Sequence, residues 1–243
     1  MKLQWQQNSI VLSSRIFAEN SRIVTVFSRD VGKTSGLARG IKTPIQPGDI
    51  NDVLWRGRLA EQLGTFKMEN IFSPFVHIFA NSQKIYAMES ACTLCSNGLP
   101  EKAPHPNLFD TLQSFLLSIP AENWLINYVF LEVSFLAEVG MGLDLSKCAV
   151  TGKAENLFYI SPRTGHAVIR EAGENYRDRL FVIPKFLISN DHRPSNSDLL
   201  EALRITGHFL KMYFYGINGA ELPLSRDYLV AWLLDESIVE IGA

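Results

Sequence analysis

The spacing of apolar residues changes near Pro74, and this change constrains the fold more than any other feature of the sequence. Before it, apolar runs are short and are separated by turn residues such as Asp30-Val31-Gly32 and Gly64. Short runs that are rich in β-branched residues and bounded by Gly, Pro, Asn and Asp are typical of strands. The pattern therefore predicts five strands in a small barrel or sandwich, at 9–14, 22–28, 34–38, 52–59 and 65–71.

After Pro74 the apolar residues recur at helical spacing. The clearest case is the stripe from Leu108 to Ile119, whose members fall at i, i+4, i+7, i+8 and i+11 and so share one helix face. Asp198 is a plausible N-cap for a later helix, because its short side chain can accept a backbone N–H bond. The other helices are predicted at 83–98, 125–137, 198–213 and 226–235.

Length and composition indicate two globular domains. The chain has 243 residues, of which 47% are hydrophobic and 20% are charged, so a disordered or collagen-like chain is excluded. We expect a β domain at 1–72 and a mainly helical domain at 73–243. Within the second domain, the segment near 144–187 is punctuated by Gly, Pro and charge and is predicted to form a small β-turn excursion.

The sequence does not predict export or a membrane span. The most apolar stretch, 124–143, is interrupted by Glu132 and Glu138, and charge at mid-bilayer is costly. The first residues of the chain lack the uncharged apolar core of a secretory signal. Only three cysteines occur, an odd number, which argues against a disulfide framework and for a reducing cytosol.

Charge is distributed unevenly along the chain. Residues 1–72 contain ten Lys and Arg against six acids, whereas the whole chain has a net charge of -2. A basic segment joined to an acidic body suggests a polyanionic partner for the basic part, although a chance bias of a solvated surface remains the alternative. On the predicted strand 52–59, Arg56 and Arg58 share one side, and Trp55 and Gly57 share the other.

Residues that carry enzyme chemistry do not form a convincing set. Gly32-Lys33-Thr34 resembles the end of a phosphate-binding loop, but Phe27 stands where that loop needs a glycine. Cys92 and Cys95 have metal-ligand spacing, yet buried packing explains them more simply. Glu132 and Glu138 point about 120° apart on a helix and cannot share a site. By elimination, a binding function is favoured.

Two segments carry a family resemblance. They are GMGLDLSKCAVTG at 140–152 and YISPRTGHAV at 159–168, and they closely resemble the middle of the RecO family of bacterial recombination and repair mediators. The opening of the chain is also similar to that family, in Ile10 to Arg15 and in Leu37 to Gly40.

The resemblance implies an α+β protein with an N-terminal five-stranded OB-fold β-barrel followed by a mainly α-helical domain. It implies that the protein is not an enzyme and uses no cofactor. Instead it implies a protein that binds single- and double-stranded DNA, anneals complementary strands and, with RecR, helps load RecA onto strands coated by the single-stranded-DNA-binding protein SSB. Such a mediator is expected in the cytoplasm, associated with the nucleoid.

Many relatives carry a four-cysteine zinc site around the central motif, and this chain departs from it. Cys148 stands at the first ligand position, but Thr151 replaces its C-x-x-C partner, and 163–173 contains no cysteine. We therefore expect a zinc-finger-like region that holds no zinc, and no metal elsewhere.

An OB barrel binds single strands with a positive groove for phosphates and aromatic platforms for bases. Trp5 and Trp55 are possible platforms, with core packing equally open for Trp55, whereas Phe27 and Phe66 are expected to fill the barrel. On the helical domain, Arg204 and Lys211 are candidate rim residues for the acidic, apolar-ended SSB tail that the resemblance implies. The candidate phosphate contacts are Arg15, Arg22, Lys33, Arg39, Lys42, Arg56 and Arg58.

Three alternatives remain open from the sequence. The first is a metal-dependent nuclease or phosphoesterase, which lacks a carboxylate cluster at ligand spacing. The second is an RNA-binding OB-fold protein, and the third is a scaffold that contacts no nucleic acid.

Overall fold

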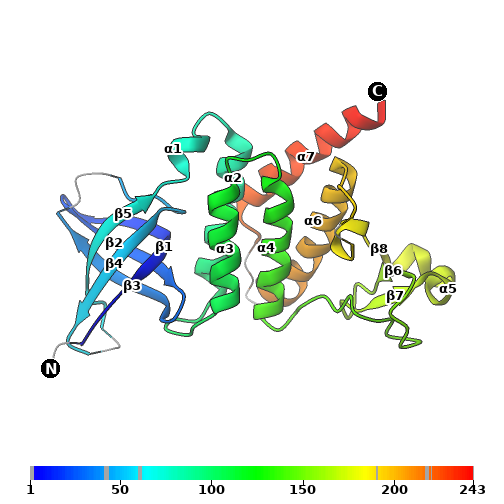
Figure 1. Cartoon of the computed structure of the whole chain (residues 1–243), viewed down its shortest axis with the longest axis horizontal. Helices are drawn as coiled ribbons and strands as arrows, with labels where there is room; N and C mark the ends of the chain where they lie inside the picture. Colours follow the sequence, from blue (N-terminus) through cyan, green and yellow to red (C-terminus); the bar gives the residue numbers. More distant parts are fainter. Residues whose placement is uncertain are drawn as a thin grey trace. The chain divides into compact units, whose positions relative to one another are not determined.

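The computed structural model describes residues 3–40, 44–59, 62–189, 191–216, 219 and 221–242. It divides into two compact units, Met1–Asn127 and Tyr128–Ala243, so the barrel shares its unit with the first helices of the chain (Figure 1). The expected boundary at residue 72 coincides with the end of the last barrel strand, whereas the compact unit continues beyond it.

The first unit begins with a closed barrel of the five predicted strands. Their order around the barrel is β1-β2-β3-β5-β4, and β3 and β5 run parallel while the other pairs are antiparallel. This is the five-stranded Greek-key arrangement of an OB-fold. The strands are β1 (Leu3–Ala18), β2 (Ser21–Ser28), β3 (Gly32–Arg39), β4 (Ile50–Gly57) and β5 (Thr65–Phe72).

Strand β1 is longer than its apolar run predicted. Its first half, Leu3 to Ile10, pairs with β4, and its second half, Ser9 to Ala18, pairs with β2. One long strand thus closes the barrel by serving two neighbours, which removes a free sheet edge. Pairing of this kind depends on distant partners, and so the local sequence did not reveal the full length of β1.

Helices α1 (Phe75–Ile78), α2 (Ser82–Gly98) and α3 (Pro106–Ser118) complete the first unit. The predicted stripe from Leu108 to Ile119 is confirmed, because all of its members are buried. Helix α2 begins where the Asn81 side chain accepts the backbone N–H of Lys84 at 2.9 Å, which satisfies one of the free donors of the first turn.

The second unit contains most of α4 (Trp124–Glu138), together with α6 (Asn196–Leu210) and α7 (Leu224–Gly242). The expected N-cap of α6 was wrong by three residues. Ser195 is the cap and Asp198 is the third helical residue, where it completes a capping box with reciprocal bonds to Ser195. Helix α7 is also longer than predicted at both ends.

A buried ion pair ties together the helices of the second unit. Glu132 on α4 accepts two bonds from the Arg226 guanidinium on α7, at 2.7 and 2.9 Å, and one from the Thr206 hydroxyl on α6. Glu132 is fully buried and Arg226 is 3% exposed. Burial alone lowers the pKa of Arg226, but Glu132 more than compensates and raises it above its ordinary value.

The predicted β-turn excursion is present as a small sheet of order β7-β6-β8, formed by β6 (Leu157–Ile160), β7 (Ala167–Ile169) and β8 (Phe181–Val182). Its core contains Cys148 packed with Tyr159 and Ile169. Burial opposes ionisation of the Cys148 thiol, but hydrogen bonds from Thr151 and from nearby backbone N–H groups outweigh it and lower the pKa to about 7.

Candidate nucleic-acid interface

One line of cross-strand partners joins two of the predicted arginines over the outer surface of the barrel. Arg56 pairs with Thr65, Thr65 with Leu37, Leu37 with Ile23, and Ile23 with Arg15. Directly opposed residues in a sheet project from the same face. The line crosses four strand-to-strand spacings, so it extends for about 19 Å over the barrel wall.

Two more of the predicted arginines lie close to this line. Arg39 follows Leu37 by two positions on β3 and therefore projects from the same face, and Arg58 follows Arg56 just beyond the end of β4. Arg15, Arg39, Arg56 and Arg58 are exposed. Arg22 is half-buried, and because it pairs with the core residue Ala38 it projects from the opposite face of β2, near the end of the strand.

OB folds bind oligonucleotides on the face of their second and third strands and at two loops, between strands one and two and between strands four and five. In this chain these elements are β2 and β3, the turn at 19–20, and the connection from Arg58 to Gly64, of which 60–61 lie outside the described residues. We use the name arginine line for Arg15, Arg22, Arg39, Arg56 and Arg58 together.

Lys33 does not belong to this group. Its ammonium donates to the Ser96 carbonyl at 2.7 Å, and its own carbonyl accepts the backbone N–H of Lys102 at 2.8 Å. Burial lowers the pKa of Lys33, and the nearby Glu101 only partly offsets this. Lys33 thus joins the barrel to the connection between α2 and α3, and its charge is not directed to solvent. Lys42, the remaining predicted contact, lies outside the described residues.

Two further cations of the first unit are already paired with acids. Arg29 makes a two-pronged contact with Asp110, with Nε and Nη2 at 2.9 and 3.0 Å from the carboxylate oxygens. This hydrogen bond is the main reason that the pKa of Asp110 is lowered. Lys67 lies 3.1 Å from Glu69 on β5.

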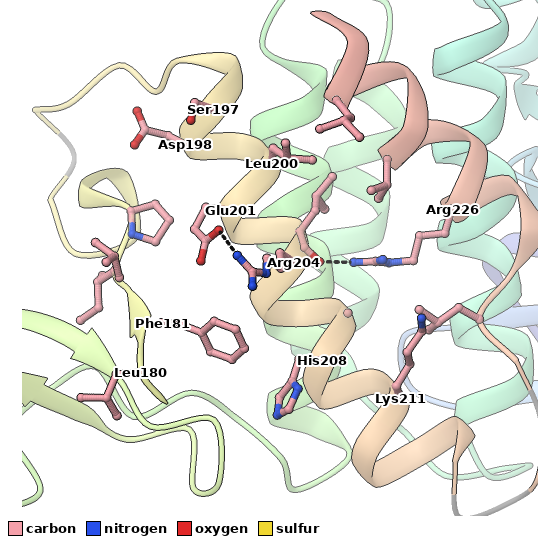
Figure 2. Close-up of a pocket in the computed structure, with 18 of the residues that line it drawn as sticks. Leu180, Phe181, Ser197, Asp198, Leu200, Glu201, Arg204, His208, Lys211 and Arg226 are labelled. Carbon is pink, nitrogen blue, oxygen red and sulfur yellow. Dashed lines mark hydrogen bonds and ion pairs between the residues drawn. The ribbon is translucent and has the colours of Figure 1, made fainter. Parts of the chain in front are cut away.

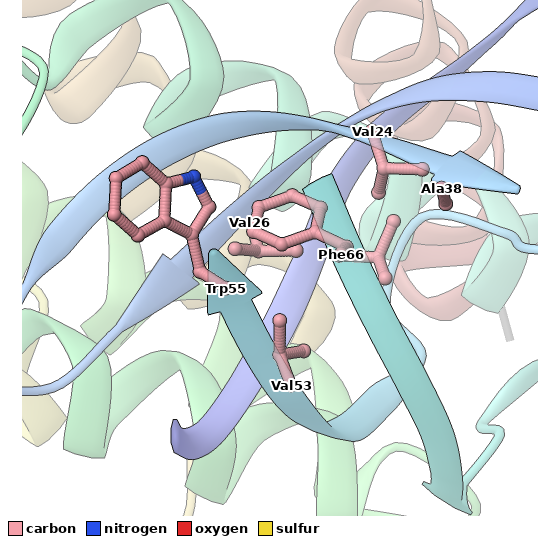
Figure 3. Packing of buried hydrophobic residues seen from close by; sticks show 7 residues of the cluster. Val24, Val26, Ala38, Val53, Trp55 and Phe66 are labelled. Atoms are coloured by element: carbon pink, nitrogen blue, oxygen red, sulfur yellow. The ribbon is translucent and has the colours of Figure 1, made fainter. Parts of the chain in front are cut away.

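Trp55 packs inside the barrel and is 3% exposed, so its face is not available to a base. Figure 3 shows its ring gathered with Val53 and Phe66 between the strands. Its indole N–H donates to the Leu63 carbonyl at 3.3 Å, and Trp5 stacks on it with ring centroids 6.2 Å apart. The packing interpretation of Trp55 is therefore correct and the platform interpretation is not. Phe66 fills the interior as predicted. Phe27 is fully buried, but the prediction that it fills the barrel was wrong: it alternates with the inward-facing Val26 and packs instead against Phe109 of α3, with ring centroids 5.5 Å apart.

The exposed aromatic residue of the barrel is one that the sequence reasoning missed. Phe17, near the end of β1, is 63% exposed, and its neighbour Ile16 is 74% exposed. The available signal was that two adjacent large apolar residues stand at the end of the strand, one residue before the Glu19-Asn20 turn. Because strand side chains alternate, both could not point inward.

The second predicted site, Arg204 and Lys211, lines a cavity of about 1150 Å³ in the second unit. Figure 2 shows Arg204 projecting from α6 toward Phe181, with Lys211 and His208 further along the helix. Arg204 lies 3.5 Å from Glu201 and 5.9 Å from the centre of the Phe181 ring.

The walls of this cavity combine apolar and charged side chains from β8, α6 and α7. Apolar surface comes from residues such as Leu180, Leu200 and Val230. Acids also line the cavity, and burial raises the pKa of one of them, Glu201. A ligand with an apolar end and a negative charge near Lys211 is compatible with such a lining.

Metal-ligating side chains do not gather in the described ranges, where no group of three or more His, Cys, Asp or Glu could hold an ion. Cys92 and Cys95 are fully buried in α2, and burial raises the pKa of the Cys95 thiol to about 12. They therefore pack as small apolar side chains. Among the described helices, none has the length and apolar character that crossing a membrane requires.

Comparison with known proteins decides the family. The model of the RecO N-terminal domain matches residues 1–75, and the model of the RecO C-terminal domain matches residues 80–217. The chain belongs to the RecO family. Residues 1–75 coincide with the barrel and the residues that follow it, so the first family domain is the OB-fold described above.

Members of the RecO family from several bacteria are similar over nearly the whole chain. "DNA repair protein RecO" of Rhodospirillum centenum is 36% identical over 235 residues, which cover 94% of each chain. The protein of the same name from Caulobacter vibrioides is 36% identical over 242 residues, which cover 97% of this chain and 95% of the relative. The family assignment makes this chain a DNA repair protein and supports a non-enzymatic role.

Proposed function

We propose that this chain binds single- and double-stranded DNA through the outer face of its barrel and anneals complementary strands. The observation that carries the proposal is the arginine line: four of its five side chains are exposed on or beside the outer face of a closed OB-fold barrel, and the described part of the chain gives none of the five an acidic partner. A guanidinium that is not already bound to a carboxylate is available to phosphate oxygens.

Annealing by such a surface requires no bond chemistry. Arginines that neutralise phosphates reduce the repulsion between two strands, and a shared surface raises the local concentration of one strand near the other. Contacts to phosphates leave the base edges unread, which suits this role because both strands must remain free to pair. The reaction is therefore limited by encounter and should weaken as salt screens the charges.

The same proposal extends to protein partners. The acidic, apolar-ended tail of SSB would bind the cavity in the second unit, with its carboxylates near Arg204 and Lys211 and its apolar end against residues such as Leu180 and Phe181. Anchored in this way to SSB-coated strands, and acting with RecR, the protein would help load RecA. We expect the protein to act in the cytoplasm, in association with the nucleoid.

The deciding experiment is an annealing assay on complementary labelled oligonucleotides coated with SSB, with and without RecR. We expect the wild-type protein to accelerate annealing, and the Arg56→Ala, Arg58→Ala double variant to do so less. Parallel incubation with Mg²⁺ or Mn²⁺ tests for a nuclease, which would shorten the strands. Competition by RNA of the same sequence tests for an RNA-binding protein. No acceleration of annealing at low salt would refute the proposal.

A further inference from the structure

The end of the β1–β2 hairpin carries the exposed aromatic ring of Phe17. This residue and Ile16 belong to a barrel strand, yet neither is part of the barrel core. Isolated exposed apolar residues are common, but adjacent ones on a regular element, rimmed by charge, mark interaction sites. Packing within the barrel does not explain them.

The strand pairing shows why Phe17 points away from the barrel. Ile16 pairs with Arg22 and Ala18 pairs with Ser21, so Phe17 is the extra residue of a β-bulge. A bulged residue has no cross-strand partner, and the bulge re-aims its side chain.

A second bulge in the same strand pair gives a useful contrast. It inserts Leu12 between Val11 and Ser13, and Leu12 is buried with 2% of its surface exposed. One bulge therefore adds a side chain to the core, whereas the hairpin bulge holds an aromatic ring in solvent.

Three arginines occupy strand positions near this ring. Arg15 lies two residues before Phe17, Arg22 faces Ile16, and Arg39 faces Ser21 on the next strand. The one acid in the sequence between Arg15 and Arg22 is at position 19, in the turn. A negatively charged chain that also presents flat apolar surfaces is complementary to this arrangement, and single-stranded DNA has both properties.

We propose that Phe17 stacks on an unpaired base of single-stranded DNA while Arg15 and Arg22 hold the flanking phosphates. This inference rests on the proposed function and adds the residue that contacts the bases. Stacking accepts every base, because each has a π face. A base held on a hairpin keeps its pairing edge open, as strand annealing requires.

The test compares full-length wild-type protein with Phe17→Ala, Phe17→Leu and Phe17→Tyr on two strands of equal length, oligo-dT and an abasic strand. Because one stacked base is lost, Phe17→Ala and Phe17→Leu should bind oligo-dT about 5- to 150-fold more weakly than the wild-type protein. Phe17→Tyr should retain the wild-type affinity. Affinity for the abasic strand should be unchanged in every variant. Phe79→Ala is the matched control, because Phe79 is 68% exposed in the same unit.

The outcomes separate the two proposals. If the wild-type protein binds neither strand, the proposed function fails. If the wild-type protein binds both strands and Phe17→Ala binds each of them with the wild-type affinity, DNA binding stands and the stacking inference is overturned. Full affinity of Phe17→Leu would also overturn it, because an apolar contact such as docking of a partner protein would then suffice. All variants should unfold at the wild-type urea midpoint, because Phe17 lies outside the core.

Discussion

The arginine line makes a numerical prediction for the salt dependence of single-strand binding. Each phosphate neutralised on a single strand contributes about -0.7 to the slope of log affinity against log salt concentration. If all five arginines of the line contact phosphates, the slope is about -3.5. Between about 50 and 200 mM salt, affinity should then fall about 130-fold.

Replacing Arg56 and Arg58 by alanine removes two of these contacts. Both side chains are exposed and no acid within the described ranges forms a salt bridge with either, so their loss should leave the barrel folded. The slope should become about -2.1, and the same rise in salt should weaken binding only about 20-fold. The difference between variant and wild type is therefore largest at low salt.

The assay is fluorescence anisotropy of a labelled oligo-dT over a series of salt concentrations. The matched control is the Lys147→Ala, Lys153→Ala double variant, which removes the same charge from exposed positions in the second unit. It should keep the wild-type slope. An unchanged slope in the Arg56→Ala, Arg58→Ala variant, or an equal change in the lysine control, would refute the assignment of phosphate binding to the barrel.

Three further outcomes test the cavity and the packing. Arg204→Glu with Lys211→Glu should weaken binding of an SSB tail peptide at least about 10-fold by charge repulsion, measured by calorimetric titration, with oligo-dT affinity unchanged. Arg226→Ala leaves the Glu132 carboxylate buried without its guanidinium partner, so the free energy of unfolding measured with urea should fall by about 3 to 5 kcal/mol. Most of this stability should return when methionine replaces both residues. Gly32→Ala should lower the free energy of unfolding by about 2 to 5 kcal/mol in the same measurement, because φ is +79° and the new Cβ would clash with the backbone carbonyl of Ala103.

The elements of the fold were largely predictable because their signals are local. Five short β-branched runs and the later helical stripes arise from side-chain periodicity, which neighbouring residues specify without reference to the rest of the chain. The errors occurred where a distant or competing partner decides. The length of β1 depends on pairing with β4 as well as β2, and the start of α6 was set by Ser195 in preference to Asp198.

The candidate site was less predictable, because a side chain's role depends on what the fold places beside it. Lys33 and Arg56 are equivalent in the sequence as basic strand residues, but the carbonyl of Ser96, 63 residues away, engages only Lys33. Trp55 was a candidate platform because of its residue type, whereas Phe17 was not considered. Closure of the barrel buried Trp55, and a bulge exposed Phe17.

Local patterns along the chain sufficed to predict that a basic β domain precedes a helical one, and the motifs pointed to the RecO family. Which charges and rings are available to a partner became clear only in the folded protein. The physical reason is that periodicity and composition act between near neighbours, whereas burial and ion pairing arise when strands and helices far apart in sequence meet. The arginine line is the clearest case, because its residues come from four strands and the loop after β4.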